Sequence, residues 1–108
     1  MQPGELKARI AFLEAGQAIN GLGETVAQWQ ARGGAWAKLV WIADGERWRA
    51  GAVEARAEAR VTCRASAAPE GFGPAWRLRH GGRDWAITAL KPLADPAWVE
   101  ITAWRVPA

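Results

Sequence analysis

At 108 residues the chain is long enough for one domain with a single core. Its 14 Lys and Arg exceed its 11 Asp and Glu to give a net charge of +3, and because the two signs are interspersed, this mild excess argues against a dedicated DNA-binding protein. The single Cys excludes an intrachain disulfide and favours a reducing compartment, and the sequence shows neither a signal peptide nor the run of about 20 apolar residues that spans a membrane. We therefore expect a soluble protein, made in the cytoplasm.

The first half of the chain predicts two strands and a long connection. Residues 6–14 form the first predicted strand, with Ile10 and Phe12 on one face. Glycines punctuate residues 16–34, which we expect to form a long connection with a short apolar middle of Val26 and Trp29. Residues 35–44 form the second predicted strand, which we expect to be buried on much of both faces, although its period is ambiguous.

Residues 45–57 fit no single element. A weak stripe at helical spacing favours a helix and consists of Trp48, Ala52, Ala55 and Ala59. Gly51 weakens such a helix by about 1 kcal/mol relative to Ala. From residue 57 onward the period changes to two, with Val61 and Cys63 on one face of a third strand. We therefore predict a long loop or short frayed helix between the second and third strands.

Two alternating runs meet at Gly81 and Gly82, which predicts a β-hairpin. Two glycines both adopt positive φ readily, as a two-residue type I′ turn requires. Counting outward from this turn pairs His80 with Arg83, Arg79 with Asp84, Leu78 with Trp85 and Trp76 with Ile87. In this register the apolar pairs share one face and opposite charges meet on the other.

The last predicted strand lies within residues 98–106 and completes a set of six. Val99, Ile101 and Ala103 fall on one face, and Trp98 and Trp104 fall on the other, where they would need a partner surface. Six short strands, one hairpin and no long helix predict an all-β protein, a small closed β-barrel or sandwich.

The residues that could carry catalysis or bind a metal are too few for either role. His80 lies beside the tight turn and Cys63 points into the predicted core, so the two do not make a nucleophilic pair. One His and one Cys cannot complete a zinc site, and the acidic residues lack metal-ligand spacing. The glycine pairs lack the strand, helix and Lys-Ser/Thr of a phosphate-binding loop. We predict no enzyme, no cofactor and no metal.

Seven short motifs follow one another over almost the whole chain. They are QPGELKARI, GLGETVAQW, WAKLV, GERWRAG, RVTCR, RLRHGGRDWAI and VEITAWR. In this order they resemble the small head–tail joining proteins of tailed bacteriophages, also called head-closure, adaptor or stopper proteins. A prophage or a gene transfer agent that encodes the same part would show the same motifs.

The resemblance implies a small β-barrel that assembles into a ring, most often of twelve subunits, at the virion neck. The ring would join the portal or an adaptor ring above to a tail terminator or other tail proteins below, close to double-stranded DNA, and would help to retain that DNA. The loop over residues 45–57 would line the channel or grip a neighbour, with the candidate residues Glu46, Arg47, Trp48, Arg49, Glu54 and Arg56. The candidate subunit interface consists of Trp98, Trp104 and Arg105. No membrane is involved.

A free-standing small β-barrel that binds single-stranded nucleic acid or a peptide is the alternative function. Trp98 and Trp104 beside Arg105 could stack bases along one sheet face. Salt-sensitive binding by a monomer would favour this alternative. Rings, or binding to a portal-like protein, would favour the neck protein.

Overall fold

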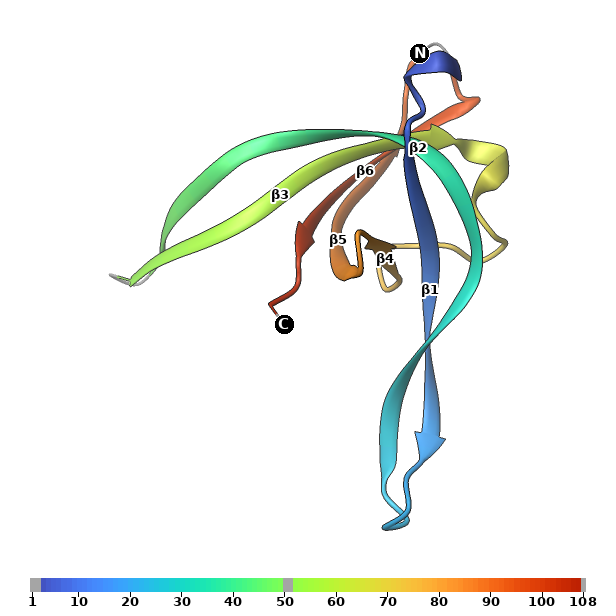
Figure 1. Cartoon of the computed structure of the whole chain (residues 1–108), viewed down its shortest axis with the longest axis vertical. Helices are drawn as coiled ribbons and strands as arrows, with labels where there is room; N and C mark the ends of the chain where they lie inside the picture. The colour runs from blue at the N-terminus through green and yellow to red at the C-terminus, as the bar shows by residue number, and fades with distance from the viewer. Residues whose placement is uncertain (1–2, 50–51, 108) are drawn as a thin grey trace.

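Six antiparallel strands form one closed barrel in the computed structural model of the chain (Figure 1). The structure describes the backbone of residues 3–49 and 52–107 and the side chains of residues 4–42 and 57–107. The elements are η1 (Pro3–Glu5), β1 (Ala8–Ile19), β2 (Thr25–Arg49), β3 (Ala52–Arg64), η2 (Ala65–Ala67), β4 (Arg77–His80), β5 (Arg83–Pro92) and β6 (Trp98–Arg105). Their order around the barrel is β1-β2-β3-β6-β5-β4, and β4 pairs with β1 to close it. The predicted all-β fold of six strands is confirmed.

The core fills the barrel from the inward positions of its strands. Ile10 and Phe12 of β1 and Cys63 of β3 are at most 1% exposed, as the predicted period of two requires. The Phe12 ring meets the edge of Phe72 with 4.9 Å between the ring centroids, and Phe72 in turn packs edge-on against Trp76 at 5.5 Å. The segment between η2 and β4 therefore contributes aromatic rings to the core.

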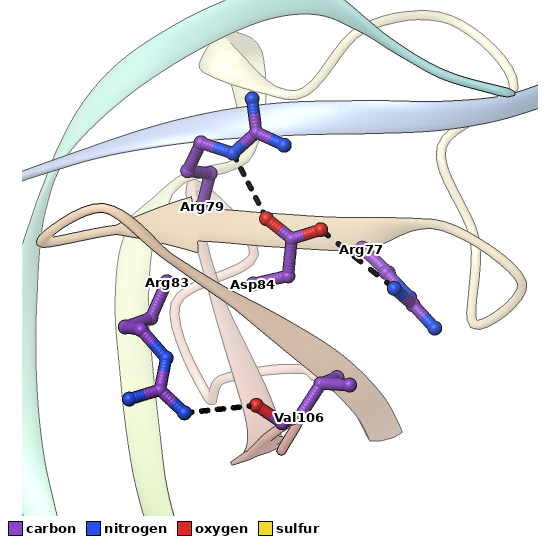
Figure 2. Close-up of polar contacts among 5 residues, drawn as sticks. All are labelled: Arg77, Arg79, Arg83, Asp84 and Val106. Carbon is purple, nitrogen blue, oxygen red and sulfur yellow. Dashed lines mark hydrogen bonds and ion pairs between the residues drawn. The ribbon is translucent and has the colours of Figure 1, made fainter. Parts of the chain in front are cut away.

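The hairpin of β4 and β5 has the predicted two-residue turn. Gly81 and Gly82 have φ values of +61° and +74°. Its register is the predicted one, with His80 opposite Arg83, Arg79 opposite Asp84 and Leu78 opposite Trp85. Figure 2 shows the Asp84 carboxylate between two guanidinium groups, with Arg79 Nε at 2.9 Å and Arg77 Nη1 at 3.6 Å from its oxygens. The charges on the outer face therefore reinforce the register that the turn sets.

β1 and β2 continue beyond the barrel as a two-stranded ribbon, which we call the β1–β2 ribbon. The expected long connection over residues 16–34 is therefore wrong, because most of this segment forms paired strands. The strands pair up to Ile19 and Thr25, and the turn between them is closed by Asn20. Asn20 Oδ1 accepts hydrogen bonds from the backbone N–H groups of Leu22 and Glu24 at 2.9 and 3.0 Å. The glycines of this segment thus permit a tight turn rather than a long loop.

β2 and β3 form a second ribbon where a loop or short helix was expected, and that expectation is wrong as well. After a register shift between Ile42 and Gly45, the strands pair from Gly45 opposite Arg56 to Arg49 opposite Ala52. Each residue of such a ribbon gains a cross-strand neighbour and backbone hydrogen bonds. A helix interrupted by glycine would have fewer such partners. The segment therefore forms paired strands instead of the short helix that the weak stripe of apolar residues suggested.

The last strand confirms one predicted face and corrects the other. Ile101 and Ala103 are fully buried in the core, and Val99 packs against it. Trp98 lies on the face opposite the core, as predicted, but it is only 6% exposed, so its prediction as an uncovered ring is wrong. β3 pairs Arg64 with Trp98, and this pairing places the guanidinium carbon 4.8 Å from the centroid of the Trp ring. A neighbouring strand of the same chain thus covers part of this ring.

The two ribbons make the molecule more extended than its length predicts. The radius of gyration is 15.4 Å, against about 13 Å for a globular domain of this size. Figure 1 shows the ribbons leaving the barrel in different directions, with β2 contributing one half to each. One long strand therefore connects two separate projections through the barrel wall.

Candidate assembly surfaces

Cys63 and His80, the two residues considered for catalysis, lie in surroundings that suit a structural role. Burial raises the pKa of the Cys63 thiol from 9.0 to about 11, so the thiol stays protonated at neutral pH and is a poor nucleophile. His80 Nδ1 lies 3.0 Å from the backbone oxygen of Arg9. Among the side chains that the structure describes, no three of His, Cys, Asp and Glu gather as a metal site would require. The described residues also include no helix that is long and apolar enough to span a membrane.

The six candidate channel residues all lie on the β2–β3 ribbon. Arg47 pairs with Glu54, and Gly45 pairs with Arg56. Glu46 lies opposite Ala55 and Trp48 lies opposite Val53, so these pairs belong to the other face of the ribbon. Arg49 ends β2 opposite Ala52. Because directly opposite residues of an antiparallel pair share a face, the backbone assigns Arg47, Arg49, Glu54 and Arg56 to one face of the ribbon. The structure thus brings most of the charged candidates together.

The three candidate interface residues of β6 are not equivalent. Trp98 is buried within the subunit, Trp104 is half-buried and Arg105 is exposed. A base-stacking platform needs at least two accessible rings side by side. The burial of Trp98 therefore removes the observation that supported the alternative function of binding single-stranded nucleic acid or a peptide.

An apolar tip ends the β1–β2 ribbon, and it was missed in the sequence. Its exposed side chains are Ile19, Leu22 and Val26, with 75%, 84% and 39% of their surface accessible. Glu24 is the only ionisable residue among residues 15–31. Exposed apolar groups that gather in one place mark sites of protein contact. The signal in the sequence was the low charge of this segment, which the prediction of a glycine-rich connection did not use.

A second exposed apolar surface lies on the outward side of β2 at the barrel, so the predicted burial of this strand on much of both faces is wrong. Trp36 and Val40 are 55% and 47% exposed, on the face opposite the buried Ala35 and Ala37. The register places Arg9 of β1 beside Trp36 and Arg60 of β3 beside Val40. The Arg9 guanidinium carbon lies 5.6 Å from the centroid of the Trp36 ring. This outer β2 face therefore combines apolar groups with basic ones.

The closed barrel thus carries two projecting ribbons and exposed apolar surfaces of the kind that mark sites of contact. The family model described as "Phage head completion protein" matches residues 1–106. The chain belongs to this family of structural proteins of the phage head.

Two solved structures are similar to the chain over nearly its whole length. One is a chain in a structure entitled "Virion of native gene transfer agent (GTA) particle", which is 27% identical with a TM-score of 0.68 and covers 95% of this chain and 97% of its own. The other is a solution structure of a protein from Shigella flexneri 2a, 20% identical with a TM-score of 0.67, which covers 97% and 96% and supports the fold alone. Among curated proteins, no significant match was found.

Proposed function

We propose that the protein forms a ring at the neck of a phage-like particle, joins the portal or adaptor of the DNA-filled head to the tail, and helps to retain the packaged DNA. The match of residues 1–106 to the head completion family carries this proposal. The likeness to a chain of a gene transfer agent virion supports the same setting. The resemblance of the sequence to neck proteins suggests twelve subunits in the ring.

The closed barrel limits how such a ring can be built. Closure gives every strand a partner on each side over part of its length, and only short stretches of unpaired edge remain at the barrel, because β4 pairs with β1 from Ala11 to Leu13 and with β5 from Arg83 to Ala86. The ribbons remain available for contacts with other chains. The β2–β3 ribbon includes residues 43–49, and at about 3.3 Å per residue these reach roughly 20 Å beyond the barrel. This reach suits an element that enters a channel or crosses to a neighbouring subunit.

The composition of the β2–β3 ribbon suits a surface beside DNA. Three Arg and one Glu share one of its faces by register, namely Arg47, Arg49, Arg56 and Glu54. Such a face attracts phosphates only over about 8 Å at physiological salt, because mobile ions screen longer distances. The mixture of signs weakens the attraction further. A ring of such ribbons would keep DNA in place without binding it so tightly that ejection stops.

Replacing residues 47–56 with a short Gly-Ser bridge tests the channel role. The strands of the barrel end at residues 42 and 58 on this side, so the barrel should keep its stability, while DNA retention or tail attachment should fail. A matched control keeps the ribbon at full length and changes Arg47, Arg49 and Arg56 to Thr, which favours strands. Particle counts by electron microscopy and DNA content after nuclease treatment measure both defects.

The two variants separate length from charge. If only the shortened variant fails, the ribbon acts through its reach, and if both fail, its charge is required. Filled, tailed and infectious or gene-transferring particles at normal titre from the shortened variant would refute the role of the ribbon. Normal particles in the complete absence of the protein would refute the neck function itself.

A further inference from the structure

Two exposed surfaces of the chain complement each other. The ribbon tip, which consists of Ile19, Leu22, Glu24 and Val26, is apolar with one acidic residue. The outer β2 face, which consists of Arg9, Trp36, Val40 and Arg60, is apolar with basic residues beside it. Lys38 also lies on this face, and its Nζ is 3.4 Å from Glu5 Oε1. Glu58 lies on the same face opposite Ile42, so the basic residues Arg9, Lys38 and Arg60 are partly offset by acidic ones. The ribbon tip is a narrow acidic projection and the outer β2 face is a broad basic side of the barrel, so the two surfaces are complementary in shape and in charge.

The two surfaces do not cover each other within one subunit. Leu22 is 84% exposed and Val40 is 47% exposed, so neither side chain is covered by the other. The ribbon points away from the barrel (Figure 1), with residues 14–19 reaching about 20 Å at 3.3 Å per residue. A turn at that distance cannot fold back onto β2 without breaking the β1–β2 pairing. Any contact between the two surfaces would therefore join two chains.

We propose that the ribbon tip of one copy docks on the outer β2 face of the next copy in the ring. This inference rests on the proposed ring. The second copy is the occupant that the charges favour, since Glu24 would approach Arg9 or Arg60. Ile19 and Val26 lie on opposite faces of the ribbon, so Leu22 of the turn and only one of these two would pack on Trp36 and Val40.

The contact is also of the kind that builds rings. The two surfaces occupy different elements of the same chain, so each subunit can offer its tip to one neighbour and receive a tip from the other. Such a heterologous, head-to-tail contact closes into a ring when the rotation between subunits permits it. A self-complementary patch would instead give a dimer.

Chemical cross-linking between two single-cysteine variants tests the contact. Leu22→Cys and Val40→Cys chains are mixed and treated with a short bifunctional maleimide at concentrations where the wild type self-associates. The native Cys63 is fully buried and its thiol stays protonated, so it does not compete. We expect a cross-linked pair of one chain of each kind. The matched control mixes Leu22→Cys with Glu70→Cys, an exposed position in the segment between η2 and β4, and should give none.

A charge swap gives an independent readout. Glu24→Lys and Arg60→Glu should each weaken self-association by about fivefold, and the chain that carries both changes should recover most of it, because the pair is restored in reverse. Light scattering over a concentration series measures the association. Equal losses that add in the double variant would refute the pairing of these two charges.

The outcomes separate this contact from the neck function. Rings that form without a Leu22–Val40 cross-link overturn the contact and leave the neck function standing. A tip that cross-links only to a portal or adaptor protein in particles also overturns it, as does a wild type that stays monomeric and uncross-linked at millimolar concentration. Failure of the neck function shows separately, as normal particles in the absence of the protein.

Discussion

Replacement of Gly82 by Val tests the turn that sets the register of β4 and β5. Gly82 has a φ of +74°, in the left-handed region that L side chains other than Asn and Asp rarely adopt. No heavy atom lies within 4 Å of the position that a Cβ would take there. A clash with neighbours therefore contributes nothing, and the whole cost comes from the backbone conformation.

The expected loss of stability in Gly82→Val follows from the backbone conformation alone. A non-glycine residue in the left-handed region costs about 1–2 kcal/mol, and a β-branched side chain belongs at the upper end of that range. For a domain of this size, each 1 kcal/mol lowers the Tm by about 4–8 °C. Gly82→Val should therefore lower the Tm by roughly 10 °C. Thermal unfolding followed by the intrinsic fluorescence of Trp gives this value directly.

Gly82→Asn is the matched control, because Asn tolerates positive φ and finds the same open space. It should lower the Tm by only a few degrees, well under half of the change for Val. If Asn and Val cost the same, the loss comes from the presence of a side chain and not from φ. An unchanged Tm for Val would show that the turn does not hold both glycines in the left-handed region.

Three further predictions follow from buried and paired groups. Trp98→Ala should lower the free energy of unfolding, measured by urea titration, by about 3 kcal/mol because the ring is buried. Trp104→Ala, at a half-buried position, should lower it clearly less. Equal losses for the two variants would contradict the burial of Trp98. Asp84→Asn should cost at most about 1 kcal/mol, because its partners are partly exposed, and a larger loss would mean that the pair does more than fix register. Because burial raises the pKa of Cys63 to about 11 from 9.0, the unfolded chain loses its thiol proton first, so the free energy of unfolding should fall by about 2 kcal/mol as the pH rises from 9 to 11. Cys63→Ala should lack this part of the fall when urea midpoints at about pH 8 and about pH 10.5 are compared; an identical pH profile would refute it.

The parts of the fold that the sequence predicted are those in which a strand buries one face. The β4–β5 register could be counted from Gly81 and Gly82 because apolar and charged side chains alternate on both sides of the turn. Ile101 and Ala103 were assigned to the core by the same alternation, and both are fully buried. Burial of one face requires an apolar residue at every second position of a strand, and this alternation can be recognised in the sequence alone.

The outer part of the β1–β2 ribbon could not be predicted in this way, since the barrel covers neither of its faces there. Residues 21–28 are exposed throughout, so no alternation between apolar and polar positions was required there. The one local signal was Asn20 followed by glycines, and it was interpreted as part of a connection. A strand stabilised by its partner alone leaves little trace in the periodicity.

The covering of Trp98 depends on a neighbour that is distant in the sequence. Arg64 reaches its ring because β3 and β6 pair in a register that places the two residues side by side. The period of β6 alone assigns Trp98 to the face opposite Ile101, which says nothing of what lies over that face. The candidate interface therefore shifts away from Trp98 to the apolar side chains of the ribbon tip and the outer β2 face, for which no single strand gave a signal.

The ribbons also restore the free edges that closure of the barrel removes. β4 pairs with β1 only from Ala11 to Leu13, so beyond that point β1 is paired on one side alone, with β2. A two-stranded ribbon is marginally stable in water, and its amides should exchange with solvent far faster than those of the barrel. Docking on a neighbour would slow that exchange because it excludes water and holds the pairing. Hydrogen exchange of residues 14–19 and 25–30 should therefore be fast in the monomer and at least tenfold slower in assembled particles, while β5 changes little. Equal protection of the ribbon in both states would mean that it meets no partner during assembly.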